Sequence, residues 1–254
     1  MKKQITVTAH RGCKGYIPEN TLPSFAEALK LKADWIEYDV HMTLDGELVL
    51  MHDSLVARTT GQKGSIDFMT LAEVKALDAG ETIYGEEWRG TRVPTMREML
   101  ELFCAADYKP DQVVEIKDFR AVVADKVVEM IDEFGLRERT IIECGDAQVL
   151  MYLHKKHPDL RLLAFPAPLM KRLDPDIYEF THAVAFPRKH PKLGDEADIR
   201  AMIAEYRAKG AEIYLFSGDN AEEIECCIAM GADNITSNYP AVCIDYLREH
   251  GYRA

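Results

Sequence analysis

Two histidines and a pair of carboxylates stand at the ends of short apolar runs in this chain. His10 and His52 each follow such a run directly. Glu37 and Asp39 lie two residues apart within a third run, so in a β-strand their side chains share one face. Two ionised carboxylates on one face of a buried strand are unfavourable unless a cation lies between them. The spacing therefore predicts a cation site.

A second pair of charged residues has the same spacing. Glu115 and Lys117 end the run 112–116, and Arg11 follows the first histidine. Three carboxylates suit a hard cation such as Mg²⁺ or Ca²⁺, which takes oxygen ligands. Arg11 and Lys117 offer positive charge to an oxyanion, and paired histidines can act as general acid and base. Each piece alone has an ordinary structural explanation, but together they predict cleavage of a phosphate ester.

Strand-like and helix-like runs alternate along the chain. Strands are expected at 5–9, 35–40, 112–116, 140–143, 161–164, 183–186, 212–216 and 234–236. Helices are expected at 22–32, 96–106, 121–134, 147–156, 196–209, 221–230 and 241–250. This alternation predicts an α/β fold, a closed (β/α)₈ TIM-type barrel whose chemistry lies at the C-terminal ends of the strands. An open doubly wound sheet is the alternative, but no G-x-G-x-x-G follows the first strand.

Two segments interrupt the alternation. The run 48–51 follows the second strand without a helix, and Asp45-Gly46 between them predicts a two-residue hairpin turn. That turn would place His52 opposite Asp39. Residues 54–93 precede the next helix and are rich in glycine, so we expect an insertion over the barrel mouth. We expect residues 1–254 to form a single domain.

Composition narrows the class of protein. The 254 residues carry a formal charge of −12, which disfavours sequence-independent binding to nucleic acid. No signal peptide, membrane anchor or transmembrane segment is expected. The six cysteines form no C-x-x-C pair, so we expect reduced thiols in a cytoplasmic protein. The sequence leaves open whether the chain forms a homo-oligomer.

A set of short motifs gives the chain a family resemblance. The sequence resembles the glycerophosphodiester phosphodiesterase family over nearly its whole length, most strongly up to Lys117. The matching motifs are Ala9-His10-Arg11-Gly12, Pro18-Glu19-Asn20-Thr21, Glu37-Tyr38-Asp39-Val40, His52-Asp53, Arg58-Thr59-Thr60-Gly61, Thr70-Leu71-Ala72-Glu73, Leu77-Asp78-Ala79-Gly80, Val93-Pro94-Thr95 and Glu115-Ile116-Lys117.

The resemblance implies a TIM-type barrel that cleaves glycerophosphodiesters to glycerol 3-phosphate and an alcohol, with a divalent metal (Mg²⁺, Ca²⁺ or Mn²⁺). It also implies roles for single residues: Glu37, Asp39 and Glu115 as metal ligands, His10 and His52 as the acid–base pair, and Arg11 and Lys117 as phosphate-binding residues. The small-molecule diester would be the only partner implied.

The C-terminal half departs from the family pattern at two places. Where the family commonly has tryptophan and Thr-x-Asn, this chain has Phe216-Ser217-Gly218-Asp219. Where the family's last strand commonly ends in Thr-Asp, this chain has Ser237-Asn238. Phe216 either lines the substrate pocket or packs in the core. These differences bear on substrate choice more than on reaction type.

Other functions remain open on the sequence alone. A relative could cleave lysophospholipids or glycerophosphoinositol, and the same barrel could be an inactive binding protein. A glycosidase with a carboxylate pair is a third alternative, but it leaves the strand-end lysine and arginine without a role.

Overall fold

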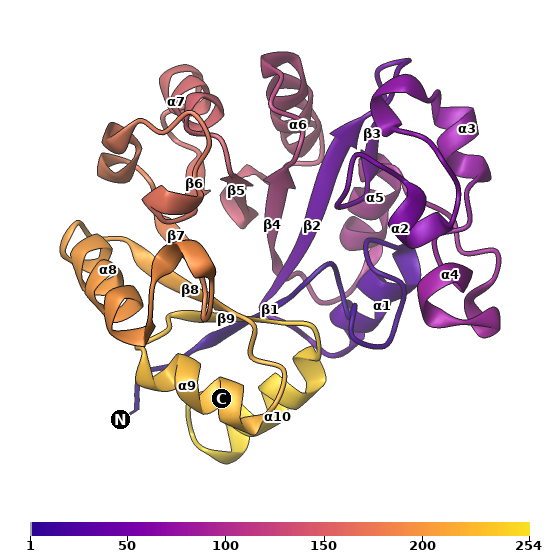
Figure 1. Cartoon of the computed structure of the whole chain (residues 1–254). Helices are drawn as coiled ribbons and strands as arrows, with labels where there is room; N and C mark the ends of the chain where they lie inside the picture. The colour runs from indigo at the N-terminus through magenta and orange to yellow at the C-terminus, as the bar shows by residue number, and fades with distance from the viewer. Residues whose placement is uncertain (1) are drawn as a thin grey trace.

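Eight parallel strands close into a barrel in the computed structural model, which describes residues 2–254. Closure follows because β1 pairs with both β2 and β9. The α-helices surround the strands, so the predicted TIM-type barrel is confirmed (Figure 1). The barrel strands are β1 (Thr6–Ala9), β2 (Trp35–Met42), β4 (Asp111–Ile116), β5 (Thr140–Cys144), β6 (Arg161–Ala164), β7 (Ala183–Pro187), β8 (Glu212–Phe216) and β9 (Asn234–Ser237).

The surrounding helices begin and end close to the expected positions. They are α1 (Leu22–Lys30), α5 (Met96–Ala105), α6 (Ala121–Glu133), α7 (Ala147–Lys156), α8 (Glu196–Ala208), α9 (Ala221–Ala229) and α10 (Pro240–Glu249). Short 3₁₀ helices complete the connections: η3 (Arg137–Arg139), η4 (Ala167–Leu169), η5 (Pro175–Glu179) and η6 (Pro191–Leu193). The β6–β7 connection contains only η4 and η5, because its prolines cannot continue a helix.

Local sequence signals explain several helix starts. Thr95 accepts a hydrogen bond from the backbone N–H of Glu98, and the Glu98 carboxylate accepts one from the Thr95 N–H. Asp195 and Asp198 begin α8 in the same reciprocal way. Such capping boxes satisfy backbone donors that the first turn leaves free.

Barrel strands are buried on both faces, as β2 illustrates. Ile36, Tyr38 and Val40 pack in the layer between strands and helices. Trp35 packs inside the barrel in a separate apolar cluster. Alternation therefore points the residues at positions 37 and 39 into the barrel mouth, above that interior cluster.

The hairpin after β2 differs from its prediction. Strand β3 (Leu48–Leu50) is antiparallel to β2, as expected, but the two-residue turn is wrong. The loop has three residues, 44–46, and the Thr43 N–H donates to the Glu47 carbonyl at 2.9 Å. Gly46 has a φ of +89°, the left-handed conformation that closes three-residue hairpin loops with a bulge.

The longer loop shifts the strand register by one residue. Met51, not His52, lies opposite Asp39, and its N–H donates to the Asp39 carbonyl at 3.1 Å. A shift of one residue exchanges the faces of a strand. His52 reaches the rim because the chain leaves the ladder after β3, not because it is the cross-strand neighbour of Asp39.

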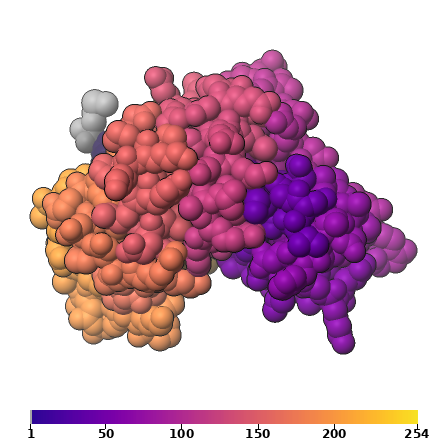
Figure 2. Space-filling model, turned by 90° about the horizontal axis from the view of Figure 1, so that it is seen from above, coloured from indigo at the N-terminus to yellow at the C-terminus, as the bar shows by residue number. Residues whose placement is uncertain are grey.

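The segment between β3 and α5 forms a small layer beside the barrel. It contains α2 (Ala57–Thr60), η1 (Ile66–Phe68), α3 (Leu71–Ala76), α4 (Glu81–Tyr84) and η2 (Glu86–Trp88). These elements share an apolar cluster of their own, built from β3 and the segment itself. In the space-filling view this violet part of the chain lies at one side of the molecule (Figure 2). Within residues 2–254, no helix is long and apolar enough to cross a membrane.

Candidate active site

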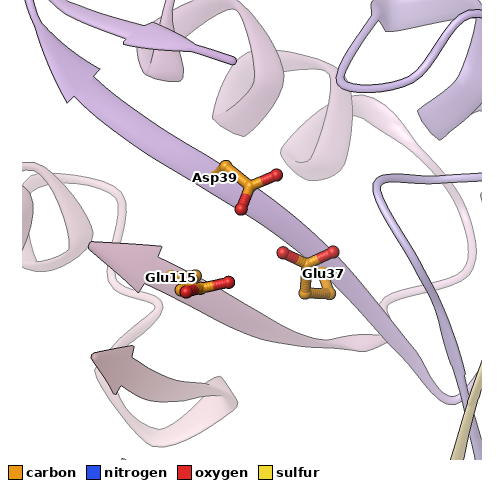
Figure 3. A group of neighbouring side chains, drawn as sticks. All are labelled: Glu37, Asp39 and Glu115. Carbon is orange, nitrogen blue, oxygen red and sulfur yellow. The ribbon is translucent and has the colours of Figure 1, made fainter. Parts of the chain in front are cut away.

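Three carboxylates converge where β2 and β4 run side by side. The strand register places Asp39 next to Glu115, with Glu37 one step below on β2. One oxygen from each residue lies within 4.8 Å of the others. The side chains point toward one another from the two strands (Figure 3). The sequence predicted this cluster from the two-residue spacing, and the register of the parallel strands brings it together.

Burial and neighbouring charge shift the pKa values of the three carboxyl groups in different directions. Burial, and then Asp39, raise the pKa of Glu37 well above its ordinary value. Burial opposes ionisation of Asp39 as well, but Lys117 and Arg11 outweigh it and hold its pKa well below the usual range. Burial raises the pKa of Glu115 to about 6, although the ammonium of Lys117 partly opposes this shift.

The cluster fits a hard divalent cation. Among the described residues, Glu37 Oε1 is buried without a hydrogen-bond donor, which is unfavourable for a carboxylate. Asp39 Oδ1 likewise accepts no hydrogen bond, and Lys117 Nζ lies 3.2 Å away. A cation that takes oxygen ligands would satisfy these atoms and remove the repulsion between the carboxylates.

Two basic side chains flank the carboxylates. Lys117 Nζ lies 2.6 Å from Glu115 Oε1, and the Arg11 guanidinium lies 3.1 Å from Asp39 Oδ2. The backbone N–H of Arg11 donates to Glu37 Oε2 at 2.8 Å. The loop after β1 is therefore tied to the carboxylate cluster by both its backbone and its side chain.

The two histidines reach the same rim from different segments. His10 follows β1, and its Nε2 lies 3.9 Å from Glu37 Oε2. Its Nδ1 lies 2.7 Å from Asn238 Oδ1. His52 follows β3, and its Nδ1 lies 2.7 Å from Asp53 Oδ1. Both rings are thus held at Nδ1, and both leave Nε2 for other partners.

Burial favours the neutral form of both rings. It lowers the pKa of His10 well below its ordinary value, and the positive charges of Arg11 and Lys14 add to the effect. Burial also lowers the pKa of His52, although the carboxylate of Asp39 opposes the shift. Neutral imidazoles can accept a proton at neutral pH.

Two carboxylates of the cluster, Glu37 and Glu115, border one pocket at the C-terminal ends of the barrel strands together with the basic side chains and the histidines, and Asp39 lies behind them. Its volume is about 160 Å³. Phe216 lines it, and the Phe216 ring centroid lies 6.4 Å from that of His10, so this side chain faces the pocket. The pocket is lined by Thr8, His10, Arg11, Glu37, His52, Val113, Glu115, Lys117, Glu143, Leu163, Phe165, Ala185, Tyr214, Phe216 and Thr236.

The sequence profile of the glycerophosphoryl diester phosphodiesterase family matches residues 10–242. The chain belongs to this family. It is therefore an enzyme of the phosphodiesterase class. The match extends from His10 at the end of β1 into α10, and so includes every residue that lines the pocket except Thr8.

Relatives of this family align along almost the full length of the chain. A glycerophosphodiester phosphodiesterase from Caldanaerobacter subterraneus subsp. tengcongensis is 32% identical, covering 96% of this chain and 98% of its own. One from Bacillus altitudinis is 30% identical, covering 92% and 94%. An Oleispira antarctica phosphodiesterase, solved with the product sn-glycerol-3-phosphate, superposes with a TM-score of 0.83 at 23% identity, covering 96% and 97%.

Three further residues contribute to the site, although the sequence alone did not predict a role for them there. Asn20 holds Asp39, since its Nδ2 donates to Asp39 Oδ2 at 2.8 Å and its Oδ1 accepts from the Asp39 N–H at 3.1 Å. Glu143 lies beside Glu115 in the strand register and lines the pocket. Asn238 contacts His10. Glu143 ends a predicted barrel strand, so its position was a signal that the spacing argument did not use.

The backbone at Asn20 and Arg11 adopts an unusual conformation where these residues contact Asp39. Asn20 and Arg11 both have positive φ angles, of 55° and 52°, which non-glycine residues rarely adopt. The Asn20 N–H donates to the Arg11 carbonyl at 3.1 Å, so the two residues stabilise each other's conformation. Such conformations persist where the surrounding contacts fix them, often at functional sites.

Proposed function

We propose that this protein hydrolyses glycerophosphodiesters to glycerol 3-phosphate and an alcohol in a metal-dependent reaction. The observation that carries the proposal is a pocket lined by Glu37 and Glu115 of the carboxylate cluster, two cationic side chains and two histidines. Membership of the family supports the substrate class. The product complex of the Oleispira antarctica relative supports it as well.

Glu37, Asp39 and Glu115 would hold the divalent cation, with Mg²⁺, Ca²⁺ and Mn²⁺ as the candidates. When bound, the cation supplies a Lewis acid that withdraws charge from phosphoryl oxygens. Arg11 and Lys117 bind the anionic phosphodiester beside it, because both side chains already lie against the carboxylate cluster.

His10 and His52 move the protons. One ring removes a proton from the attacking hydroxyl group, and the other protonates the oxygen of the departing alcohol. Phe216 supplies an apolar wall of the pocket on the side of His10. We propose that this wall contacts the glycerol or alcohol moiety.

The attacking hydroxyl belongs either to water or to the glycerol moiety itself. A neighbouring substrate hydroxyl gains from its intramolecular position and would give a cyclic phosphate first. An analogue with hydrogen in place of that hydroxyl separates the two routes. Turnover of the analogue close to the parent's rate would leave water as the nucleophile, and its loss with binding retained would favour the cyclising route.

An activity screen tests the proposed function. We expect turnover of glycerophosphocholine, glycerophosphoethanolamine, glycerophosphoglycerol or glycerophosphoinositol, loss of activity in excess chelator, and recovery with added Mg²⁺, Mn²⁺ or Ca²⁺. A human relative, 23% identical, is a lysophospholipase D, so lysophosphatidylcholine belongs in the screen. Full activity of metal-stripped enzyme would overturn metal dependence, and activity on none of the diesters would overturn the substrate class.

We also propose that the protein acts in the cytoplasm, within glycerophosphodiester metabolism. All six cysteines are free thiols: Cys13, Cys104, Cys144, Cys226, Cys227 and Cys243. Free thiols persist in a reducing compartment. Cell fractionation locates the protein, and a thiol-reactive probe reports whether its cysteines are reduced. Recovery of the protein outside the cytoplasm with oxidised cysteines would contradict the proposal.

A further inference from the structure

A chain of hydrogen bonds links the loops after β8 and β9 to His10. Asp219 follows β8, and Asn238 follows β9. Asn238 Nδ2 donates to Asp219 Oδ2 at 2.6 Å, and Asn238 Oδ1 lies 2.7 Å from His10 Nδ1. Asp219 and Asn238 are also among the positions at which the chain departs from the family pattern.

The partners of Asp219 fix it as an acceptor. Its Oδ1 accepts from the Asn238 backbone N–H at 2.7 Å and from the Ser237 hydroxyl at 3.1 Å. With the Asn238 side-chain amide on Oδ2, three donors surround the two oxygens. The two donors on Oδ1 do not depend on the direction of that amide, and a carboxylate has no proton to donate, so Oδ2 needs a donor from the amide that faces it.

The orientation of the Asn238 amide then follows. A flipped amide would place its carbonyl oxygen against the Asp219 carboxylate at hydrogen-bond distance, with two acceptors facing each other. The NH₂ group must therefore face Asp219, and the carbonyl oxygen must face His10. Because that oxygen can only accept, His10 must donate from Nδ1.

This direction decides which nitrogen of His10 is free for chemistry. A neutral ring with its proton on Nδ1 carries its lone pair on Nε2. Nε2 is the nitrogen that lies 3.9 Å from Glu37 Oε2, at the carboxylate cluster. The alternative tautomer would carry its proton on Nε2 and could not accept another there.

We propose that Asp219 and Asn238 are positioning residues that hold His10 in the Nδ1–H tautomer with Nε2 facing the reaction. Asp219 acts through Asn238, and Asn238 acts through His10; neither borders the pocket. The consequence for catalysis rests on the proposed role of His10 as acid or base. The tautomer itself does not depend on that role.

His52 is held differently. Its Nδ1 lies against the carboxylate of Asp53, with no amide between them. The Asp53 carboxylate also contacts Arg58. Each histidine thus has its own hydrogen-bond acceptor at Nδ1. Only the acceptor of His10 is an amide, whose direction a second residue must set.

The first measurement is the tautomer of His10, read from ¹⁵N chemical shifts of the metal-stripped, substrate-free protein at a pH where the ring is neutral. His10→Gln assigns the signal. We expect Nδ1 protonated in the wild-type protein. In Asp219→Asn the two donors on Oδ1 keep the new carbonyl oxygen in place, so the new NH₂ group faces Asn238 and reverses its amide. The Asn238 NH₂ group then faces His10, and we expect the tautomer protonated on Nε2. A wild-type ring protonated on Nε2 would overturn the proposal whatever the activity shows.

The second measurement exchanges the two side chains. In Asp219→Asn/Asn238→Asp the new carboxylate at 238 accepts from His10 and from the new amide at 219, so we expect the Nδ1–H tautomer to return. We expect Asp219→Asn and Asn238→Ala to lower kcat about 10- to 100-fold with little change in KM, which is less than the roughly 10²–10⁴-fold loss expected when the acid–base group itself is removed. The double variant should recover most of this loss.

The control is Asp245→Asn on the exposed face of α10, which should change neither reading. Thermal melts identify variants that lose the fold. Single variants with wild-type kcat, or a folded double variant with no recovery of tautomer and kcat, would overturn the proposal. A wild-type protein with the expected tautomer but no phosphodiesterase activity would overturn the proposed function and leave the positioning in place.

Discussion

His10 and His52 are the residues whose removal bears most directly on the proposed chemistry. Their Nε2 atoms are not used in the Nδ1 contacts that hold the rings. We expect His10→Ala and His52→Ala each to lower kcat by about 10²–10⁴-fold, the usual contribution of a general acid or base. Steady-state kinetics measures this. His250→Ala, at an exposed histidine, is the control, and a loss below threefold in either active-site variant would contradict the assignment.

The carboxylate cluster can be tested by metal binding without turnover. Residues around a metal site typically contribute 10- to 100-fold to affinity, and removing a ligand charge should cost more, so Asp39→Asn should lose at least about 100-fold in affinity. Titration calorimetry with Mn²⁺ on metal-stripped protein measures the change. Asp245→Asn is the matched control, and unchanged Mn²⁺ affinity in Asp39→Asn would remove this residue from the ligand set.

Glu143 gives a prediction about pH and stability. Burial and the charge of Glu115 raise its pKa well above the ordinary value. Folding therefore strengthens proton binding, and stability is lost as pH rises from the unfolded pKa through the folded one, by about 1.4 kcal/mol per pH unit between them. Glu143→Gln should match wild type near pH 4 and exceed it in Tm at pH 8, in metal-free protein. Equal melting temperatures at both pH values would contradict a strongly raised pKa.

At the scale of elements, the loop after β1 depends on close packing against α1. Gly12 has a φ of +78°, and a Cβ there would lie 2.7 Å from the backbone carbon of Ser24. The Ser24 hydroxyl accepts from the Cys13 N–H at 2.7 Å and donates to the Arg11 carbonyl at 3.1 Å. A side chain at position 12 must therefore displace the loop that carries the neighbouring site residues.

We expect Gly12→Ala to destabilise the protein by roughly 1–3 kcal/mol and to lower kcat/KM, because strain and steric overlap add. Urea unfolding and kinetics measure the two effects. Gly135→Ala is the control, since Gly135 has a φ of +66° but no atom within 4 Å of an added Cβ. A Gly12→Ala variant with wild-type activity and stability would contradict this prediction, because it would show that α1 can shift to admit the new side chain without displacing the site residues.

At the scale of the whole molecule, the single-domain organisation of residues 1–254 stays a prediction. The segment beside β3 has its own apolar cluster, so separate melting is a real alternative. Trp35 lies in the barrel and Trp88 in η2 of that segment. The Trp88→Phe variant keeps only Trp35 as fluorophore, and the Trp35→Phe variant keeps only Trp88. We expect coincident urea midpoints, as a two-state domain requires; an earlier transition reported by Trp88 would contradict it.

A bound cation should stabilise the whole barrel, because the ligands come from β2 and β4 and meet only in the folded chain. At 100 times its dissociation constant, the cation should add about 2.7 kcal/mol. Melting curves with and without Mg²⁺, Ca²⁺ and Mn²⁺ measure this. Glu37→Gln should lose the effect while remaining folded, and stabilisation that survives this change would place the cation elsewhere.

The sequence by itself determined the barrel and the membership of its rim. Helical and strand periodicities alternate clearly, and parallel strands in a barrel all end at one face. Residues such as His10, Glu37 and Glu115 therefore had to meet once their strands were located. Their types restricted the chemistry to a cation and an oxyanion, since those are what carboxylates and basic side chains bind.

Tertiary structure alone decided register and the contacts between distant segments. Asp45-Gly46 is compatible with loops of two or three residues, because both place glycine in the left-handed region, and the register between β2 and β3 is that of the longer loop. His10 and Asn238 are separated by 228 positions, and no local pattern links them. Only closure of the barrel between β9 and β1 brings that amide to the ring, and with it the direction of the hydrogen bond.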